Sequence, residues 1–583
     1  MAMISEDEQL AKLARKYGYL NAIEHNGKGN LNSVLGKILA EKPDLKSQAD
    51  GVKTLATQEL LAINRLSPDQ QKTRFENEFP GELERQIAKK KELSKEASEK
   101  KQTLPPLVDA EQGKVVTRFP PEPNGYMHIG HAKAAILGSE YAKMYKGKFL
   151  VRFDDTNPAA EKKEYYEAFL ESFSWLGIGY DLVRNASDDM LKFYDLAGKM
   201  ISSSKAYVCD CSQIVMREKR ARGELCEHRA QSLSTNLSLW QDMVSGKLTT
   251  STLRFVGDLN SLNTTMRDPV LFRIVEEPHP LKGNSFFVWP TYDFDGPVED
   301  SLDGVTHATR SKEYELRDEL YYAILDALDL RKPRIIEFSR LQLQDTTVSK
   351  RSLKKLIEEG KVMGWDDPRL PTIAGLKRRG FLPEAIKEFV LSMGLSKVES
   401  QPTWDLLESI NRKLIDPIAG RYFFVEDPVT VDVENAPNIT VTMRLHPDFD
   451  FGTKAIETKG KFLISKNDAA RVHEGSKFRL IEAYNVSVIS KEETLIRARY
   501  LPNESTEKTE KLQWVTSEQS IPFEVMVTGP LLINEQYNPE SLRLANGRIE
   551  WAATNLKPGQ IFQLVRFGFC RLDSPGIAIM AHK

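Results

Sequence analysis

This chain contains few cysteines and lacks long apolar segments. Only four cysteines occur in 583 residues, which argues against a disulfide framework of the kind that stabilises small secreted domains. No run of 18 apolar residues is present, so no transmembrane helix is predicted. The N-terminal sequence MAMISEDEQLAKLARKYG also lacks the hydrophobic segment of a secretory signal. We therefore expect a cytoplasmic protein with no membrane partner.

The charge balance shows no bias toward one sign, because 81 basic and 83 acidic residues leave a net charge of −2. A protein that binds RNA needs a local basic face rather than a basic total, so this balance neither indicates nor excludes an RNA partner. The length exceeds what a single hydrophobic core usually supports, and it predicts several domains.

Residues 1–104 are expected to form a helical N-terminal appendage and a charged linker. The segments LAKLARKYGYLNAIEH and DGVKTLATQELLAINRL place apolar residues at the spacing of a helix. The charge-rich stretch ELERQIAKKKELSKEASEKKQ then precedes Pro105 and Pro106. Two consecutive prolines interrupt a helix, so we expect a domain boundary close to residue 104.

The stretch RFPPEPNGYMHIGH, residues 118–131, carries the strongest functional signal. An apolar β-branched pair precedes it and the segment AKAAILGSEYAKMY follows it, which predicts a strand, a turn and a helix. In this geometry the helix N-terminus presents free backbone N–H groups to an anionic ligand. His128 and His131 stand at that entry, and Gly130 leaves room for a flat or phosphorylated ligand. Taken alone, two such histidines would more often be surface or capping residues.

Strands and helices then alternate, which predicts an α/β fold with a parallel, doubly wound sheet and ligands at the carboxyl ends of its strands. KFLVRFDDTNP, residues 148–158, is the second strand and ends at Asp154 and Asp155, a pair that in most proteins caps a turn. From about residue 190 to 290 the alternation stops, and an inserted α+β module is predicted. After residue 420 apolar residues recur with a period of two, which predicts an all-β C-terminus.

Three of the four cysteines lie close together in the sequence, as Cys209-Asp-Cys211 and Cys226-Glu-His228. Thiolate and imidazole ligands in two such pairs could close a tetrahedral zinc site. The alternative is a loop of unmetallated thiols, because the spacing in each pair is tighter than the usual one of zinc ligands. We keep Cys209, Cys211, Cys226 and His228 as candidate zinc ligands.

Several motifs, in order, resemble those of one enzyme family. They are PPEPNGYMHIGHAKAA, FDDTNP, PTYDF, GVTHATR and, at residues 346–355, TTVSKRSLKK. Together they are similar to the signatures of class I aminoacyl-tRNA synthetases of the glutamyl/glutaminyl branch. The all-β C-terminus resembles the archaeal and eukaryotic glutamyl type, whereas the bacterial type ends in helices. The resemblance covers roughly residues 105–583.

The resemblance implies a multidomain fold. We expect a Rossmann-type α/β catalytic domain in two halves, an inserted α+β acceptor-stem module, a helical connector that contacts the tRNA stem, and C-terminal anticodon-binding β-barrels. The expected boundaries are residues 105–190 and 291–345 for the two catalytic halves, 191–290 for the insertion, 346–420 for the SKR loop and connector, and 421–583 for the barrels.

The resemblance also implies the ATP site. In this family the two histidines of HIGH hold the ATP triphosphate and stabilise the transition state at the α-phosphate, which suits a reaction catalysed by positioning and positive charge. A mobile loop that contains SKR brings a lysine to the phosphates, and in this chain Val348 replaces its usual methionine. The expected catalytic residues are His128, His131 and Lys350. The expected ATP-binding residues are His128, Gly130, His131, Ser349, Lys350 and Arg351.

Glutamate, rather than glutamine, is the expected amino acid. Arg310 stands where glutamyl enzymes have arginine and many glutaminyl enzymes have cysteine, and Gly296 stands where a glutaminyl-type histidine would be. Two guanidinium groups, of Arg118 and Arg310, would demand an anion, because a neutral amide would leave buried charge uncompensated. The alternative is that Arg310 contacts tRNA or is structural. The expected glutamate-binding residues are Arg118, Glu122, Asp154 (for the α-ammonium group), Tyr292 and Arg310.

The implied reaction uses ATP and Mg²⁺ to convert L-glutamate to glutamyl-adenylate, and then transfers the glutamyl group to the 3′ end of tRNA-Glu. Whether tRNA-Gln is a second acceptor stays open, as does a structural zinc ion. We expect a monomer. One alternative is a glutaminyl-tRNA synthetase, which Arg310 and Gly296 oppose. Another is a non-catalytic tRNA-binding paralogue, which the intact HIGH and SKR elements oppose.

Overall fold

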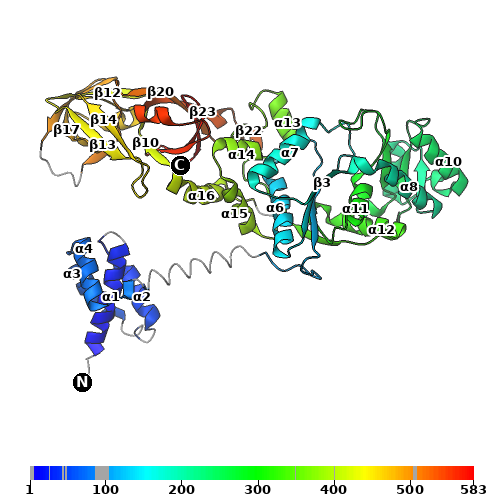
Figure 1. The fold of residues 1–583 in the computed structure, drawn as a ribbon, viewed down its shortest axis with the longest axis horizontal. Helices are drawn as coiled ribbons and strands as arrows, with labels where there is room; N and C mark the ends of the chain where they lie inside the picture. The colour runs from blue at the N-terminus through cyan, green and yellow to red at the C-terminus, as the bar shows by residue number, and fades with distance from the viewer. Residues whose placement is uncertain are drawn as a thin grey trace. The chain divides into compact units, whose positions relative to one another are not determined.

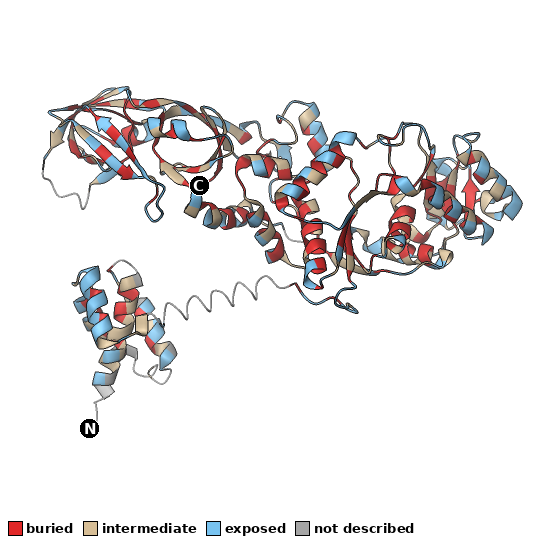
Figure 2. Cartoon of the chain, in the orientation of Figure 1, coloured by how far each residue is buried: buried red, intermediate tan, exposed pale blue. Residues whose placement is uncertain are grey.

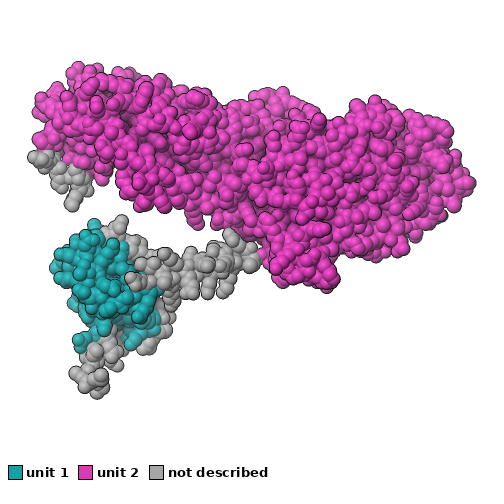
Figure 3. Space-filling model, viewed as in Figure 1, with its two compact units in different colours: residues 1–103 teal, residues 104–583 magenta. Residues whose placement is uncertain are grey.

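The computed structural model describes residues 6–24, 27–42, 45, 49–83, 85, 104–347, 349–398, 401–502 and 509–583. The chain forms two compact units, residues 1–103 and 104–583 (Figure 3). Val348 and most of the charge-rich stretch predicted as a linker lie outside the described residues. Within the described ranges, no helix is both long enough and apolar enough to cross a membrane.

The first unit is helical, and two of its helices cover the segments in which the sequence predicts them. Its helices are α1 (Glu6–Glu24), α2 (Leu31–Glu41), α3 (Ala49–Ile63) and α4 (Pro68–Glu78). Ala14, Val34 and other apolar residues of the first three helices form one small core. The buried amide of Gln71 donates to the carbonyl oxygens of Gly27 and Ile63 at 3.0 and 2.9 Å. These bonds attach α4 to the preceding helices, because a buried amide needs partners.

The second unit begins with parallel strands (Figure 1). They are β1 (Val116–Phe119), β2 (Lys148–Phe153), β3 (Leu182–Asn185), β8 (His307–Ser311) and β9 (Arg334–Phe338). β1, β2 and β3 pair in that order, and β8 pairs with β9. β8 lies against the other edge of β1, because the backbone N–H of Thr306 donates to the carbonyl oxygen of Val116 at 2.9 Å. The order β3-β2-β1-β8-β9 is that of a doubly wound fold.

A single apolar core joins this sheet to its helices α6 (Ile129–Met144) and α7 (Lys163–Leu176). Phe119, Ile136 and Val151 belong to it and are almost fully buried. Burying side chains of this size contributes about 1.5–3 kcal/mol each. Because α6 is buried along much of its length (Figure 2), its first turn is fixed at the carboxyl ends of β1 and β2.

Between β3 and β8 the chain forms an antiparallel sheet in the order β4-β5-β6-β7. Its strands are β4 (Ala206–Cys209), β5 (Thr252–Phe255), β6 (Val270–Ile274) and β7 (Val288–Pro290). The helices of this region are α8 (Met190–Ser202), α9 (Gln213–Arg222) and α10 (Leu233–Val244), and α11 (Tyr292–Leu302) and α12 (Asp318–Leu328) follow. Trp240, Phe272 and Phe294 lie in one core, so α11 is packed against this sheet.

Four helices follow β9: α13 (Lys350–Glu358), α14 (Ile373–Arg379), α15 (Pro383–Met393) and α16 (Trp404–Ile415). A hairpin of β21 (Leu532–Ile533) and β22 (Gln536–Tyr537) packs on this region. Leu531 shares an apolar cluster with Leu353 and Leu356 of α13, and the hydroxyl of Tyr537 donates to the carbonyl oxygen of Lys361 at 3.0 Å. The hairpin therefore connects the C-terminal part to the helix that begins at the predicted SKR loop.

The C-terminal part is built of β-sheets that curl into near-barrels (Figure 1). One sheet has the order β10-β24-β25-β26-β20-β23-β11, and another the order β15-β12-β18-β17-β16-β19. The first contains β10 (Gly420–Tyr422), β11 (Phe424–Glu426), β20 (Ser520–Thr528), β23 (Leu542–Glu550), β24 (Ile561–Leu564), β25 (Gly568–Ser574) and β26 (Ile577–His582). The second contains β12 (Pro428–Glu434), β15 (Lys461–Ser465), β16 (Lys477–Leu480), β17 (Asn485–Lys491), β18 (Leu495–Leu501) and β19 (Glu510–Leu512). The remaining elements are β13 (Ile439–Arg444), β14 (Thr453–Thr458) and α17 (Lys466–Arg471).

Candidate active site

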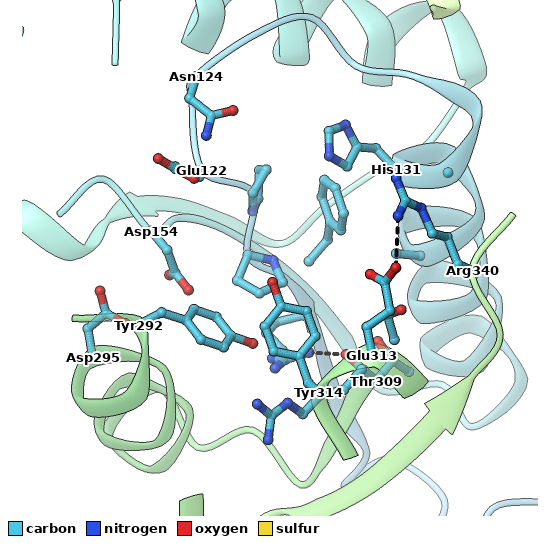
Figure 4. Close-up of a pocket in the computed structure, with 18 of the residues that line it drawn as sticks. Glu122, Asn124, His131, Asp154, Tyr292, Asp295, Thr309, Glu313, Tyr314 and Arg340 are labelled. Atoms are coloured by element: carbon cyan, nitrogen blue, oxygen red, sulfur yellow. Dashed lines mark hydrogen bonds and ion pairs between the residues drawn. The ribbon is translucent and has the colours of Figure 1, made fainter. Parts of the chain in front are cut away.

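A cleft of about 480 Å³ lies at the carboxyl ends of β1, β2 and β8 and at the N-termini of α6 and α11 (Figure 4). The predicted site residues that line it are Arg118, Glu122, His128, Gly130, His131, Asp154, Tyr292 and Arg310. Three predicted residues, Ser349, Lys350 and Arg351, do not line it. The sheet edge therefore brings together side chains that are up to about 190 residues apart in the sequence.

His128 and His131 occupy the first turn of α6. The Nδ1 atom of His128 accepts hydrogen bonds from the backbone N–H groups of Gly130 and His131, at 3.1 and 3.2 Å. The Nδ1 atom of His131 accepts from the backbone N–H of His128 at 3.5 Å, and the ring centroids are 3.6 Å apart. Because each Nδ1 is an acceptor, these bonds assign the ring proton to Nε2 in both histidines.

Both imidazoles are held neutral. Burial, together with the nearby His131 and Arg340, holds the pKa of His128 well below its usual value. Burial, assisted by Arg340, lowers the pKa of His131 to about 4. The pair can offer two neutral N–H donors to a phosphate oxygen. The positive charge of the cleft must come from other side chains.

Packing favours glycine at position 130. A Cβ atom at this position would lie 3.0 Å from the ring of His128 and 3.2 Å from the carbonyl oxygen of Leu341. The backbone N–H of Ile129 donates to the carbonyl oxygen of Pro371 at 2.9 Å, which ties this turn to the chain before α14. The sequence prediction attributed the glycine to ligand approach, and the ring of His128 and the carbonyl oxygen of Leu341 also leave little room for a side chain there.

Arg118 enters the cleft from β1, yet its charge is balanced inside the protein. Its Nε and Nη2 atoms donate to the two carboxylate oxygens of Asp300, both at 2.9 Å, and Nη1 donates to the carbonyl oxygen of Thr309 at 2.6 Å. Arg152 also donates to Asp300 at 2.9 Å. Burial alone would raise the pKa of Asp300, but the two guanidinium groups lower it to about 2. The expectation that Arg118 carries uncompensated charge is therefore corrected.

Asp154 follows β2 and faces the cleft beside Tyr292 (Figure 4). Arg152 donates to both of its carboxylate oxygens, from Nε at 2.7 Å and from Nη2 at 3.4 Å. Burial raises the pKa of Asp154, although Arg152 opposes this shift. Asp154 thus presents a carboxylate to the cleft while one cation holds it in place.

Arg310, at the end of β8, is the buried cation with an unused donor. Its Nη1 donates to Asp318 at 2.7 Å. The rings of Tyr292, Tyr314 and Tyr321 lie around the guanidinium, with centroids 5.7, 5.5 and 5.1 Å from its central carbon. The Nε atom is buried and has no hydrogen-bond partner among the described residues. A buried N–H without a partner is costly, so a ligand acceptor at this position would be stabilised.

Four charged residues that line the cleft were not predicted from the sequence: Arg273, Asp295, Glu313 and Arg340. Arg340 pairs with Glu313 at 2.8 Å and lies near His131 (Figure 4). Its position just after β9, at the carboxyl edge of the sheet, is a signal that could have identified it. Asp295 directly follows the motif PTYDF, and no pattern in the sequence distinguishes it from an ordinary helix aspartate.

Lys350 begins α13, and its side chain approaches the turn before α6. A Cβ atom at Gly125 would lie 3.6 Å from its Cγ. Burial lowers the pKa of Lys350 to about 8, with Glu122 opposing the shift and Lys354 adding to it. Lys350 is therefore near the loop of residues 122–125, outside the cleft wall.

The four candidate zinc ligands converge within the β4–β5 region. Their ligand atoms all lie within 4.8 Å of one another. The Sγ atoms of Cys209 and Cys211 are 3.7 and 3.4 Å from Sγ of Cys226, and Nδ1 of His228 is 3.3 to 4.0 Å from the three sulfurs. Tetrahedral zinc with bonds of about 2.3 Å to sulfur and about 2.0 Å to nitrogen places its ligands about 3.5–3.8 Å apart. The donor set fits zinc in chemistry and spacing.

Comparison with known proteins places this chain in a family. Residues 114–417 match the catalytic domain of the class I tRNA synthetases (E and Q), and residues 419–501 and 511–573 match anti-codon binding domains of the same family. A solved glutamate tRNA ligase from Elizabethkingia meningosepticum CCUG26117 is 20% identical, with 52% of this chain and 70% of that chain covered and a TM-score of 0.39.

Curated relatives are more similar over the whole length. The glutamate–tRNA ligase of Nitrosopumilus maritimus (strain SCM1) is 42% identical, with 99% of this chain and all of the relative covered. Those of Cenarchaeum symbiosum (strain A) and Pyrococcus abyssi (strain GE5 / Orsay) are each 40% identical, over 98% and 99% of this chain and 99% and 100% of the relatives. This chain therefore belongs to the class I tRNA synthetases of the glutamyl and glutaminyl group.

Proposed function

We propose that this chain is a glutamate–tRNA ligase, which activates L-glutamate with ATP and transfers the glutamyl group to the 3′ end of tRNA-Glu. The observation that carries the choice of amino acid is Arg310. Its buried Nε has no partner among the described residues and lies in the same cleft as the two histidines of α6. The full-length similarity to archaeal glutamate–tRNA ligases supports the same reaction.

In the activation step, an α-carboxylate oxygen of glutamate attacks the α-phosphorus of ATP, and pyrophosphate leaves. The N-terminus of α6 and the Nε2–H groups of His128 and His131 would donate to the oxygens on which charge develops. Arg340, and Lys350 once its loop closes, would supply the positive charge that the neutral histidines do not. No base is required, because the attacking carboxylate is already ionised at neutral pH.

Mg²⁺ bound with ATP would neutralise phosphate charge. Glu122 offers a carboxylate in the cleft that Asn157 supports, with Nδ2 donating at 3.0 Å. The only group of three or more metal-binding side chains among the described residues is the cysteine cluster. This agrees with a magnesium ion carried mainly by the substrate phosphates, as is usual for this metal.

For recognition, we assign the side-chain carboxylate of glutamate to Arg310 and the α-ammonium group to Asp154, with Tyr292 lining the site and Arg118 positioning it through Asp300. An amide could still accept from Nε of Arg310, but it would bring no charge, and a bond to an ionised group is worth about twice a neutral one. The glutaminyl-tRNA synthetase alternative is disfavoured for this reason.

We assign tRNA contacts to four regions. A second cavity, of about 610 Å³, shares Arg273, Tyr292 and Tyr314 with the cleft and is also lined by Arg220 and Arg317. Its arginines suit a phosphodiester chain that enters with the 3′ end. We place the acceptor-stem module at residues 191–290 and the helical connector at 346–420. The near-barrels at 421–583 would read the anticodon, which agrees with the matching family models.

We further propose a structural zinc ion held by Cys209, Cys211, Cys226 and His228, whose ligand atoms lie within 4.8 Å of one another. The residues of the N-terminal unit would form an appendage to the catalytic unit. As a translation enzyme, the protein would act as a monomer in the cytoplasm.

The test is aminoacylation of purified tRNA-Glu and tRNA-Gln with labelled glutamate or glutamine. We expect transfer of glutamate to tRNA-Glu, and charging of tRNA-Gln with glutamate would show a non-discriminating enzyme. Transfer of glutamine would contradict the amino-acid assignment and leave the fold standing. No transfer in any pairing would support the non-catalytic paralogue.

A further inference from the structure

Asp295 is a buried carboxyl group in the wall of the cleft, one turn into α11, close to Asp154 in Figure 4. Its side chain is fully buried. One oxygen, Oδ2, accepts from the hydroxyl of Thr156 at 2.6 Å. The other, Oδ1, is buried and has no hydrogen-bond partner among the described residues. Buried oxygens without a hydrogen-bond partner are rare in native structures, because an unpaired buried acceptor destabilises the fold.

The neighbouring cations do not satisfy this oxygen. Arg273 donates through Nη1 and Nη2 to the carbonyl oxygens of Pro290 and Thr156, at 2.6 and 3.0 Å. Arg152 gives its hydrogen bonds to Asp154, Asp300 and Asp303. Among the described residues, Asp295 therefore has two guanidinium groups nearby but forms no direct ion pair with either.

We propose that Asp295 joins Asp154 in a two-carboxyl subsite that binds the α-ammonium group of the amino-acid substrate. The inference deepens the proposed function and rests on it. An ammonium group has three N–H donors. Because both oxygens of Asp154 already accept from Arg152, a second carboxyl group is needed to satisfy these donors, and Oδ1 of Asp295 is unused. The subsite therefore binds an amino acid in preference to the corresponding acid that lacks the amino group.

The subsite has a consequence for proton uptake. The charged groups around Asp295 are Asp154 on the loop after β2, Arg152 on β2 and Arg273 on β6. Burial, and then the charge of Asp154, raise the pKa of Asp295 well above its usual value, with both arginines opposing. A bound ammonium favours the ionised carboxylate, so binding releases a proton. The KM for glutamate should then fall as the pH rises through the titration of Asp295.

The experiment compares Asp295→Ala and Asp295→Asn with the wild type in the presence of tRNA. The measured quantities are the KM for glutamate, the KM for ATP and inhibition by glutarate, which has both carboxylates and no amino group. The matched control is Asp326→Asn, which removes an exposed carboxylate paired only with Lys332 among the described residues. The thermal unfolding midpoint of each variant shows that it is folded.

We expect both Asp295 variants to raise the KM for glutamate roughly tenfold to a hundredfold, the range of a charge-assisted hydrogen bond. The KM for ATP and the affinity for glutarate should stay at the wild-type value, and Asp295→Asn should flatten the pH dependence of the glutamate KM. A wild-type KM in Asp295→Asn would instead show a structural bond to Thr156 and overturn the proposal. So would an equal loss of affinity for glutarate.

The outcome is separable from the proposed function. If the wild type activates an amino acid other than glutamate, the proposed function fails. The same variants are then measured with that amino acid and its analogue that lacks the amino group. Equal effects on both ligands overturn the subsite, and a selective effect on the amino acid supports it.

Discussion

Single residues in the cleft differ in whether the protein itself balances their charge. Arg118 has a carboxylate on two of its nitrogens and a carbonyl oxygen on the third. Arg310 keeps an unused Nε and Asp295 an unused Oδ1. We assign direct ligand contacts to Arg310 and Asp295 because each keeps an unused polar atom, and a positioning role to Arg118 because its polar atoms are already paired. The distinction follows from the free-energy cost of leaving a buried polar group without a hydrogen-bond partner.

Lys350 tests the proposal that the histidines act as neutral hydrogen-bond donors while other side chains supply the positive charge for the phosphates. Replacing it with alanine should lower kcat about 10²-fold to 10³-fold, because the cation acts on the developing phosphate charge. Its pKa of about 8 means that the free enzyme is charged there below that pH and neutral above it. The KM for ATP should therefore rise as the pH increases past about 8. Lys355→Ala, which removes an exposed lysine paired with Glu359, is the control. An ATP KM that stays constant through pH 9 would contradict this role.

Asp300 should matter more for folding than for binding. Asp300→Asn leaves Arg118 and Arg152 buried without their shared carboxylate, and losing one partner of a buried pair costs about 3–5 kcal/mol. The folded pKa of about 2 lies below the unfolded value, so this stabilisation is present above about pH 4 and is lost as the pH falls toward 2. Urea unfolding at pH 7 and pH 3 measures both effects. Equal stability of the variant and the wild type at pH 7 would refute the account.

The sequence could indicate which residues would meet in the cleft, but not how they are paired. His128, His131 and Asp154 follow strands in recognisable motifs, so their convergence at one sheet edge is predictable. The bond from Arg118 to Asp300 joins residues 182 positions apart, and no local pattern reports it. Asp295 could not be separated from an ordinary exposed helix aspartate, because only packing shows that its oxygen is buried and unpaired.

At the scale of elements, the turn between β1 and α6 can be predicted from the sequence, whereas the strand pairing beside the cysteine cluster cannot. The turn is predictable because proline, glycine and a helix N-terminus follow each other directly. The register of β4 to β7 is not predictable from residues 206–290 alone, because these strands are short and are joined by connections of very different length. The pairing of Cys209 with Thr252 in the β4–β5 ladder holds one half of the cysteine cluster.

The cysteine cluster leads to a testable prediction about bound zinc. Purified protein should contain a single zinc ion, and a chelator or Cys226→Ser should remove it. Because folding around a structural zinc is coupled to binding, loss of the metal should lower the thermal midpoint. Metal analysis and thermal unfolding measure the two effects. The control is Cys570→Ala, since Cys570 is buried in the C-terminal sheet away from this cluster. A metal-free, fully active protein with an unchanged midpoint would reject the zinc assignment.

For the whole molecule, the period-two pattern after residue 420 correctly indicated β-sheets, and the order of their strands had to come from the structure. Strands far apart in the sequence pair there, such as β10 with β24. The hairpin of β21 and β22 then contacts α13, so the sheets and the catalytic half share an apolar cluster. Sequence patterns cannot report such a contact, because it depends on how complete elements pack.

The measurement that tests the central claim is the ratio of kcat/KM for glutamate to kcat/KM for glutamine, on tRNA-Glu, for the wild type and Arg310→Cys. Arg334→Cys, at an exposed arginine paired with Asp109, is the control. A site built for a polar partner discriminates by roughly 10⁴-fold. We predict that Arg310→Cys loses most of this ratio through a fall in glutamate transfer, while the control keeps it. An unchanged ratio in Arg310→Cys would contradict the claim that Arg310 selects glutamate by its charge.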